Sequence, residues 1–516
     1  MNSGDVSEYN KRGADYAVSG EYQRALAEFS QAILIQPQEA SSYYNRALVY
    51  RSLSDYQQAL VDLQQVLTLL PTYALAYYQR GITYYLLCDN RRAIHDFSTA
   101  LALNEQNIQL DVQSLVGRSV VYVIMEEYEQ ALLNLNRAIG LDERVAGRLG
   151  AYGNRGQAFA ALKRYDEAIT DFYQALYFKP DDVILLNRLG AAYTDSGRPE
   201  HSLEHYQKAL SLQPRMAFTY NNRGEAYRLL ERYDEALADF NQALEIDEML
   251  ATVYYNRGLV YENLVAPQQS INDYTHALSL DPTFIAIYHD RAGLYCRNKQ
   301  YQAAVQDYTT ALVYDPSDAM ALFGRGTMYL YLEQPLDAVE DFNRVIDLQP
   351  DFACAYNNRG EAYLYLRNLW RAREDCLHSW HLDTSHADHG WMAQWVNICL
   401  QEPDESMPDV LERIAAEEPA DYAAYLCRGV AYFLRQQHTL ALQELEYALT
   451  LNAEKWDAYF WKGMISASLA HEDEALASLQ RAVALKIPAV LLSPLHWLQH
   501  EHADFYIKHA STFLRK

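Results

Sequence analysis

The sequence predicts an all-α protein built from tandem pairs of helices. Three observations predict this fold: a residue pattern that returns after about 34 residues, apolar spacings of three and four within each copy, and proline near the end of many copies. The octapeptide YNNRGEAY shows the period most clearly. It occurs at Tyr220–Tyr227 and again, four periods later, at Tyr356–Tyr363.

We number the positions of each copy from the glycine of the Asn-Arg-Gly motif, which is position 0. Fourteen copies follow one another, and ten of the thirteen steps between zero positions are equal in length. The exceptions are three longer steps, which lead into Ser119, Gly156 and Trp395. The zero positions are Gly13, Ala47, Gly81, Ser119, Gly156, Gly190, Gly224, Gly258, Ala292, Gly326, Gly360, Trp395, Gly429 and Gly463.

Each copy contains the apolar pattern of two amphipathic helices. Position −4 is aromatic in most copies and +3 is commonly Tyr, which gives the first helix one core face. Positions +12 and +19 are small and +16 is large, which gives the second helix a complementary face. Pro199, Pro267 and Pro335 at +9 suit the first turn of that second helix. Proline at +24 in eight copies ends it.

This pattern resembles the tetratricopeptide repeat, whose signature is Trp-x2-Leu-Gly-x2-Tyr followed by Ala-x3-Phe, Ala and Pro. The resemblance covers about residues 6–487. Here Tyr replaces the Trp of the signature and Arg replaces its Leu. The resemblance implies a right-handed α-solenoid, or superhelix, of helix-turn-helix units, with a concave groove lined mainly by first helices. Beyond the repeats, the apolar residues near the C-terminus predict a capping helix.

The pattern divides the chain into four parts. Residues 6–384 hold units 1–11, with insertions near 104–118 and 141–153 that we expect to lengthen connections. Residues 385–419 form a degenerate unit 12, where the turn at 402–409 predicts a bend or weak boundary, and 420–487 hold units 13 and 14. Residues 488–516 are predicted to cap the final unit through Leu491, Leu492, Leu495, Trp497, Leu498, Phe505 and Ile507.

Arginine at position −1 is predicted to form an ion pair within its own unit. In ten of the eleven units with this Arg, position +15 is Asp or Glu, and Asn134 is the exception. In the three units without it, +15 is His205, Val410 or Ser478. A structural pair therefore explains the Arg better than an anion site does. The predicted pairs include Arg46–Asp62, Arg80–Asp96, Arg155–Asp171, Arg223–Asp239, Arg257–Asp273 and Arg359–Asp375.

The face opposite the core is the predicted binding surface, because positions −3, −2 and +1 lie on it. Position −2 is often Asn, which has modest helix propensity. Either all units inherited it from one ancestor, or its carboxamide binds an extended peptide backbone. In some superhelical members of the resembled family, including O-linked N-acetylglucosamine transferases, an Asn ladder lines the groove. The candidate groove residues are Tyr44, Asn45, Tyr78, Gln79, Asn154, Asn221, Asn222, Glu225, Tyr255, Asn256, Asn357, Asn358 and Glu361.

The net charge of the chain limits the kinds of molecule that it is expected to bind. A formal net charge of −25 argues against nucleic acid and anionic membranes and favours neutral or basic protein ligands. We expect no transmembrane span, no secretory signal and six reduced thiols, as in a cytoplasmic protein. No nucleotide loop, nucleophile elbow, kinase signature or HExxH is present, so we expect neither an enzyme nor a cofactor.

The segment at His378–His389, HSWHLDTSHADH, contains two HxxH spacings beside Cys376. A zinc or nickel site is one interpretation. We expect no metal, because the segment spans a helix end and a connection.

The repeats, the candidate groove residues and the net charge together predict a scaffold or adaptor that binds a protein or extended peptide in the groove. The alternative is a solenoid that self-assembles into a homo-oligomer without a groove ligand.

Overall fold

The computed structural model describes residues 6–104, 106–383, 387–400, 407–417 and 419–514. Within these ranges the chain is helical and contains no β-strand. It forms two compact units, Met1–Ala266 and Pro267–Lys516, so the division falls between the two helices of the eighth repeat. We describe each unit by itself.

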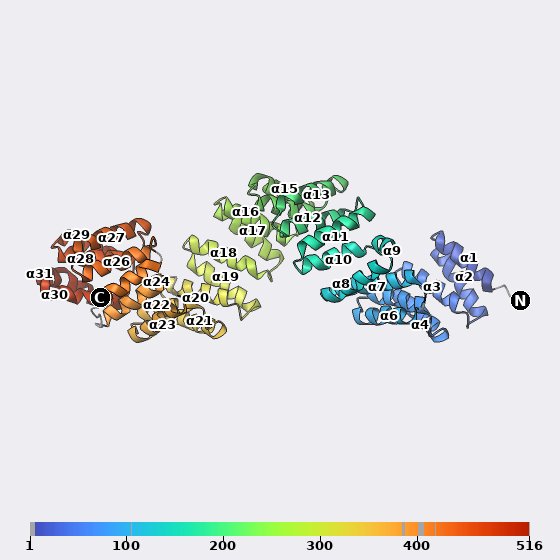
Figure 1. Cartoon of the computed structure of the whole chain (residues 1–516), viewed down its shortest axis with the longest axis horizontal. Helices are drawn as coiled ribbons and strands as arrows, with labels where there is room; N and C mark the ends of the chain where they lie inside the picture. Colours follow the sequence, from blue (N-terminus) through green and yellow to red (C-terminus); the bar gives the residue numbers. More distant parts are fainter. Residues whose placement is uncertain (1–5, 105, 384–386, 401–406, 418, 515–516) are drawn as a thin grey trace. The chain divides into compact units, whose positions relative to one another are not determined.

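The predicted helix pairs are confirmed throughout the described residues, and consecutive helices pack against one another within each unit (Figure 1). In a typical repeat a first helix of 13 residues, such as α14 (Ala217–Leu229), is followed by a three-residue turn and a second helix of 14 residues, α15 (Tyr233–Ile246). The helices of the N-terminal unit are α1 (Val6–Val18), α2 (Tyr22–Ile35), α3 (Ala40–Ser52), α4 (Tyr56–Leu69), α5 (Ala74–Leu86), α6 (Asn90–Leu103), α7 (Ile108–Ile124), α8 (Tyr128–Leu141), α9 (Glu143–Arg148), α10 (Ala151–Ala161), α11 (Tyr165–Phe178), α12 (Val183–Asp195), α13 (Pro199–Leu212), α14, α15 and α16 (Ala251–Asn263).

Glycine at position 0 allows the two helices of a pair to approach each other. A Cβ atom on Gly224 would lie 2.8 Å from the ring of Phe240 at position +16, and one on Gly156 would lie 2.8 Å from Phe172. Contacts this short would force the rings to move. The small residue and the large ring are therefore two halves of one packing contact.

The two insertions change helices as well as connections. The first one lengthens α7 to 17 residues, while the connection from Leu103 to Ile108 stays as long as the others, so the expectation of a longer connection is wrong there. Helix formation is favoured because the added residues extend an apolar face that includes Leu110 and Val112, both buried. The second insertion does lengthen a connection and folds as the short helix α9.

The C-terminal unit begins with regular repeats and ends in a large aromatic core. Its helices are α17 (Pro267–Leu280), α18 (Ile285–Arg297), α19 (Tyr301–Tyr314), α20 (Ala319–Tyr331), α21 (Pro335–Leu348), α22 (Ala353–Tyr365), α23 (Leu369–Leu382), α24 (Ala387–Cys399), α25 (Met407–Glu417), α26 (Tyr422–Leu434), α27 (His438–Leu451), α28 (Trp456–Ser468), α29 (Glu472–Ala484), the 3-10 helix η1 (Ala489–Trp497), α30 (Leu498–Glu501), α31 (Ala503–Phe505), the π-helix η2 (Tyr506–Ala510) and α32 (Ser511–Leu514).

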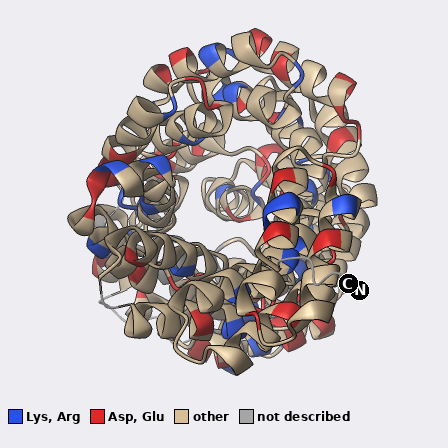
Figure 2. Cartoon of the chain, turned by 90° about the vertical axis from the view of Figure 1, so that its right-hand side faces the viewer, with Lys and Arg blue, Asp and Glu red and all other residues tan. Residues whose placement is uncertain are grey.

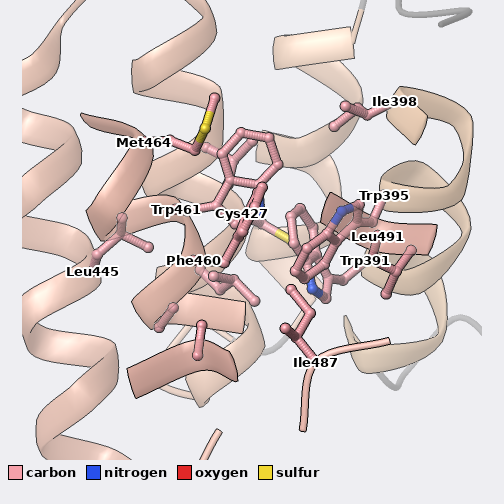
Figure 3. Packing of buried hydrophobic residues seen from close by; sticks show 14 of the residues in the cluster. Trp391, Trp395, Ile398, Cys427, Leu445, Phe460, Trp461, Met464, Ile487 and Leu491 are labelled. Atoms are coloured by element: carbon pink, nitrogen blue, oxygen red, sulfur yellow. The ribbon is translucent and has the colours of Figure 1, made fainter. Parts of the chain in front are cut away.

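Trp391, Trp395 and Trp461 form the centre of this core (Figure 3). The rings of Trp391 and Trp395 are 5.3 Å apart, and those of Trp395 and Trp461 are 5.8 Å apart. All three side chains are fully buried. The degenerate twelfth repeat is thus part of one continuous hydrophobic cluster; the predicted bend at 402–409 falls mostly on residues 401–406, outside the described part.

The C-terminal residues do more than cap the last helix pair. Helix η1 packs against α24 and α22, and Ser493 Oγ donates to the carbonyl oxygen of Cys399. Leu491 and Leu495 are fully buried, as predicted, whereas Ile507 is exposed. Ile507 therefore takes no part in the packing, because the π-helical turn that contains it directs its side chain away from the core.

Candidate functional site

Arginine at position −1 is held by the acid at +15 of the same repeat. Arg223 Nε and Nη2 each donate to one carboxylate oxygen of Asp239 at 2.7 Å, and the side chains are 13% and 8% exposed. Hydrogen bonding to Asp62 raises the pKa of the equivalent Arg46. The same two-bond geometry joins Arg46–Asp62, Arg80–Asp96, Arg155–Asp171, Arg291–Asp307, Arg325–Asp341 and Arg359–Asp375.

The third nitrogen of this guanidinium reaches the preceding repeat. Arg46 Nη1 donates to Ser30 Oγ at 3.0 Å, and Arg359 Nη1 donates to Asn343 Oδ1 at 2.7 Å. The acceptor lies at position +17 of the preceding repeat, a role that the sequence analysis missed. The sequence does contain a pattern that predicts this bond, because position +17 is Ser, Thr, Asn or Gln in the repeats concerned. These acceptors are Ser30, Gln64, Ser98, Asn136, Gln207, Asn241, Thr275, Thr309 and Asn343. Each of these Arg side chains thus reaches from its own helix to the second helix of the preceding repeat.

Tyrosine rings at positions −4 and +3 lie on either side of the Arg guanidinium. The guanidinium carbon of Arg223 lies 5.6 Å from the Tyr220 ring centre and 5.8 Å from that of Tyr227. Positions −4, −1 and +3 follow one another along one helix face, so the Arg lies between two aromatic rings. The two departures from the family signature therefore form one physical unit.

Two repeats show what happens when one member of the pair is replaced. Arg118 donates from Nε and Nη2 to the single amide oxygen of Asn134, and burial lowers the pKa of Arg118. Lys462 instead contacts Glu446 at 3.0 Å, which occupies position +17 of the preceding repeat. The predicted pair Arg257–Asp273 has one partner in each compact unit and stays a prediction.

In the sixth repeat an aromatic cluster replaces the pair. Tyr173 Oη lies 3.2 Å from His205 Nε2 and 3.2 Å from Tyr193 Oη, and the Tyr193 ring stacks on that of His205 at 5.6 Å. Burial lowers the pKa of His205. The cluster fills the place of an ion pair with side chains that are neutral at pH 7.

On the face predicted to line a groove, the asparagines of three repeats are hydrogen-bonded to one another. Asn256 Nδ2 donates to Asn221 Oδ1 at 3.0 Å, Asn221 donates to Asn222 at 3.3 Å, and Asn222 donates to Asn187 at 3.4 Å. Position −2 of one repeat thus contacts position −3 of the preceding repeat. We call Asn187, Asn221, Asn222 and Asn256 the Asn row. Each carboxamide has more hydrogen-bonding sites than the row uses.

The other candidate groove residues of the N-terminal unit are half-buried. Gln79 accepts a hydrogen bond from Arg51, and burial raises the pKa of the neighbouring Tyr44 to about 12. Glu225 accepts from Arg228 Nε and Nη2, both at 2.7 Å. The half-buried residues Asn45, Tyr78, Asn154 and Tyr255 complete this set. Much of this polar face is therefore internally bonded before any ligand arrives.

The C-terminal unit contains a cavity of about 460 Å³ beside the predicted residues Asn357, Asn358 and Glu361. One wall is the groove face of α20, α22 and α24. The opposite wall is formed by the turn before α28, including Lys455 and Trp456. Asn358 Nδ2 donates to Thr327 at 3.3 Å on the first wall. The sequence could not place the second wall, because the two walls lie far apart along the chain.

Two exposed ion pairs join the turns on either side of this cavity. Lys299 Nζ lies 3.3 Å from Glu454, and Lys486 contacts Glu333. The pairs connect the turns of repeats 9 and 10 with those that follow α27 and α29. The last repeats therefore fold back toward the middle of the C-terminal unit. Charged residues of both signs are interspersed along the helices (Figure 2).

The remaining sequence hypotheses concern metal and membrane. Among the described residues no group of three or more His, Cys, Asp or Glu side chains could hold a metal ion. His378 packs against the Tyr356 ring at 4.4 Å, and His386 lies outside the described residues. No described helix is both long and apolar enough to cross a membrane.

Comparison with known families identifies one repeated motif. Models described as tetratricopeptide repeat match residues 40–73, 150–182, 181–249, 251–284, 273–306 and 290–330. These matches lie on both compact units. No curated protein matches the chain.

Three solved structures are similar to parts of the chain or to most of it. YrrB, described as a tetratricopeptide repeat protein with an unusual peptide-binding site, is 25% identical, with a TM-score of 0.31, covering 36% of this chain and 95% of its own. A tetratricopeptide repeat protein from Parabacteroides merdae is 19% identical, with a TM-score of 0.38 and coverages of 52% and 98%. A chain of the Cut9–Hcn1 complex is 15% identical, with a TM-score of 0.37 and coverages of 83% and 96%. At TM-scores below 0.5, none of these likenesses bears on what the chain binds.

Proposed function

The chain belongs to the tetratricopeptide repeat family, and from this premise we propose that it is a non-catalytic scaffold that binds an extended segment of a partner protein along its first helices. The observation that carries the proposal is the Asn row. Its carboxamides are held in place by their mutual bonds and keep further donors and acceptors for a peptide backbone. Positioned amide groups at a regular spacing suit an extended chain, which presents its own amides at regular intervals.

The negative charge of the chain favours neutral or basic partners. Acidic residues outnumber basic ones by 68 to 43 over the whole sequence. The regular Arg residues at −1 do not offset this at the binding face, because their carboxylate partners and the +17 acceptors occupy them. Electrostatic attraction would then raise the association rate of a basic segment at low salt.

The test compares partner capture by the full chain with capture by the triple variant Asn222→Ala, Asn256→Ala, Asn358→Ala. A matched control variant, Gln269→Ala with Gln306→Ala, removes exposed carboxamides from second helices. Quantitative mass spectrometry of the captured proteins should show a loss of about tenfold or more for the triple variant only. Thermal melting followed by circular dichroism checks that both variants remain folded.

Equal retention of every partner by a folded triple variant would exclude the groove proposal. Light scattering of the purified chain at several concentrations tests the alternative. A mass that rises to a defined oligomer without any partner would favour self-assembly instead.

A further inference from the structure

Two residues that line the 460 Å³ cavity each carry a buried hydrogen-bonding atom with no partner among the described residues. Trp391 is only 1% exposed, and its indole Nε1 donates to no acceptor in the described part of the chain. Asn357 Oδ1 is also buried and accepts from no donor there. Buried polar atoms are nearly always hydrogen-bonded, since an unmet group loses its bonds to water and gains nothing in return. A donor and an acceptor on two residues of one cavity are the complements that the carbonyl oxygen and the N–H of a peptide would meet.

The cavity is also acidic and aromatic. Its lining includes the carboxylates of Glu333, Glu361, Glu454 and Asp457 and the ammonium groups of Lys455 and Lys486, an excess of two negative charges. Lys299 at the rim, paired with Glu454, reduces the excess to one.

Two tyrosine rings and one indole lie among these charges, those of Tyr331, Tyr365 and Trp456. Burial raises the pKa of Tyr365, and the carboxylates of Glu361 and Glu333 raise it further. Carboxylates together with aromatic faces favour a cation.

The size and walls of the cavity suit a short peptide stretch. Its volume lies within the usual range of ligand sites, which is roughly 300–1,000 Å³. Met392 also lines the cavity, is half-buried and has an unbranched, adaptable side chain that can adjust to a bound peptide. The ion pairs Lys299–Glu454 and Lys486–Glu333 beside the cavity are more than half exposed and hence weak, so they leave its charged side chains free to rearrange around a ligand.

We propose that this cavity binds a short stretch of a basic partner peptide. One peptide group of the partner accepts a hydrogen bond from Trp391 Nε1 through its carbonyl oxygen, and a peptide N–H donates to Asn357 Oδ1. A neighbouring Lys or Arg side chain lies among the carboxylates and the rings of Tyr331 and Tyr365. The proposal rests on the proposed function, because it names where and how one part of the partner segment is held.

The test follows the indole N–H of Trp391 by NMR in the ¹⁵N-labelled full chain. Its resonance is assigned by its loss in Trp391→Phe, which keeps an aromatic ring and removes the donor. The probes are the blocked tripeptides acetyl-Ala-Arg-Ala-amide and acetyl-Ala-Glu-Ala-amide at millimolar concentration. We expect the arginine peptide to shift the Trp391 resonance in a saturable way and the glutamate peptide to leave it in place.

Variants separate the cavity from the rest of the molecule. Asn357→Ala should weaken binding of the arginine peptide about tenfold, the usual effect of losing one buried hydrogen bond. Asn222→Ala, in the Asn row of the other compact unit, should leave it unchanged. Dispersion of the other indole resonances shows that each variant is folded.

An unmoved Trp391 resonance with the arginine peptide would overturn the proposal, and so would equal shifts with both peptides. An Asn357→Ala variant that is folded and binds as well as the wild type would also overturn it. These failures leave the proposed function standing if Asn222→Ala with Asn256→Ala still loses partners in the capture experiment.

Discussion

The regular repeats and the last three repeats contain the same helix pair, but the residues at positions −3 and −2 of its first helix differ in polarity and burial. In the seventh repeat, positions −3 and −2 are Asn221 and Asn222, half-buried and polar. In the fourteenth they are Phe460 and Trp461, fully buried in the aromatic core. The same backbone position therefore offers hydrogen bonds in one region and closes the face with hydrophobic packing in the other.

The two regions also differ in what links successive repeats. Regular repeats are joined by the Arg at −1, which bonds to its own repeat and to the preceding one. The twelfth repeat has Gln394 there, and Trp395 at position 0 packs against Trp391, Trp456 and Trp461 instead. At the twelfth repeat a continuous apolar core thus replaces the polar link, whereas Arg428 and Lys462 of the last two repeats still contact Glu444 and Glu446.

Truncating the aromatic core should have the largest effect. Trp395→Ala removes a fully buried indole and should destabilise the C-terminal unit by about 4 kcal/mol. All seven Trp residues lie between Trp370 and Trp497, so urea unfolding followed by Trp fluorescence reports on this unit alone. Trp370→Ala, at a ring that is 62% exposed, is the matched control and should cost far less. Equal losses would mean that the core is not the source of stability here.

Breaking one polar link should have the next largest effect, in the other unit. Asp239→Ala leaves the guanidinium of Arg223 buried without its carboxylate and should cost about 3 kcal/mol. Hydrogen exchange of the α14 and α15 amides measures the loss locally. In a double-mutant cycle with Arg223→Ala the two losses should not add. Additive losses would show that the pair is not a coupled unit.

Completing an incomplete link should stabilise the N-terminal unit. Asn134→Asp gives Arg118 the second oxygen that its counterparts have and a charge to match its own. We expect a gain of about 1 kcal/mol, less than the loss at Asp239 because the Asn already accepts two bonds and its own N–H to Gln130 is given up. Exchange of the α7 and α8 amides should slow. Faster exchange would contradict the interpretation of the carboxylate as the preferred partner.

The smallest effect is expected at the aromatic cluster of the sixth repeat. Burial lowers the pKa of His205 below that of the unfolded chain, so the unfolded state binds more protons as the pH falls below about 6.5. The contribution of this site is therefore fully present above that pH and decreases toward pH 5. His205→Gln should flatten this dependence by less than about 1 kcal/mol, read from urea unfolding by circular dichroism at each pH. His201, Glu204, Lys208 and the hydroxyls of Tyr173 and Tyr193 surround the ring, so His201→Gln is the matched control.

The sequence predicted the helix pairs and the Arg–acid contacts because both recur within one repeat length. Arg223 and Asp239 lie within a single repeat, so the same contact recurs in other copies and its pattern is visible in the sequence. The asparagines at −2 and −3 were predicted to lie opposite the core face, but their mutual bonds were not foreseen, because most of these bonds join position −2 to −3 of the preceding repeat. The second wall of the cavity could not be predicted from the repeat pattern. Lys455 and Trp456 meet α22 only because the degenerate repeat and the C-terminal residues depart from the period.

The third bond of the regular Arg has a consequence for how the number of repeats can change. Arg46 finds its acceptor at position +17 of the repeat before it, and other regular repeats offer Ser, Thr, Asn or Gln at that position. Outside the fifth, sixth and eleventh repeats, loss or duplication of one whole regular repeat would therefore leave each guanidinium with an acceptor; the eleventh carries Leu377 at that position. The two identical YNNRGEAY segments are separated by a whole number of such steps. The chain is thus built so that its length can be altered by recombination in whole repeats, whereas the aromatic end tolerates no such change.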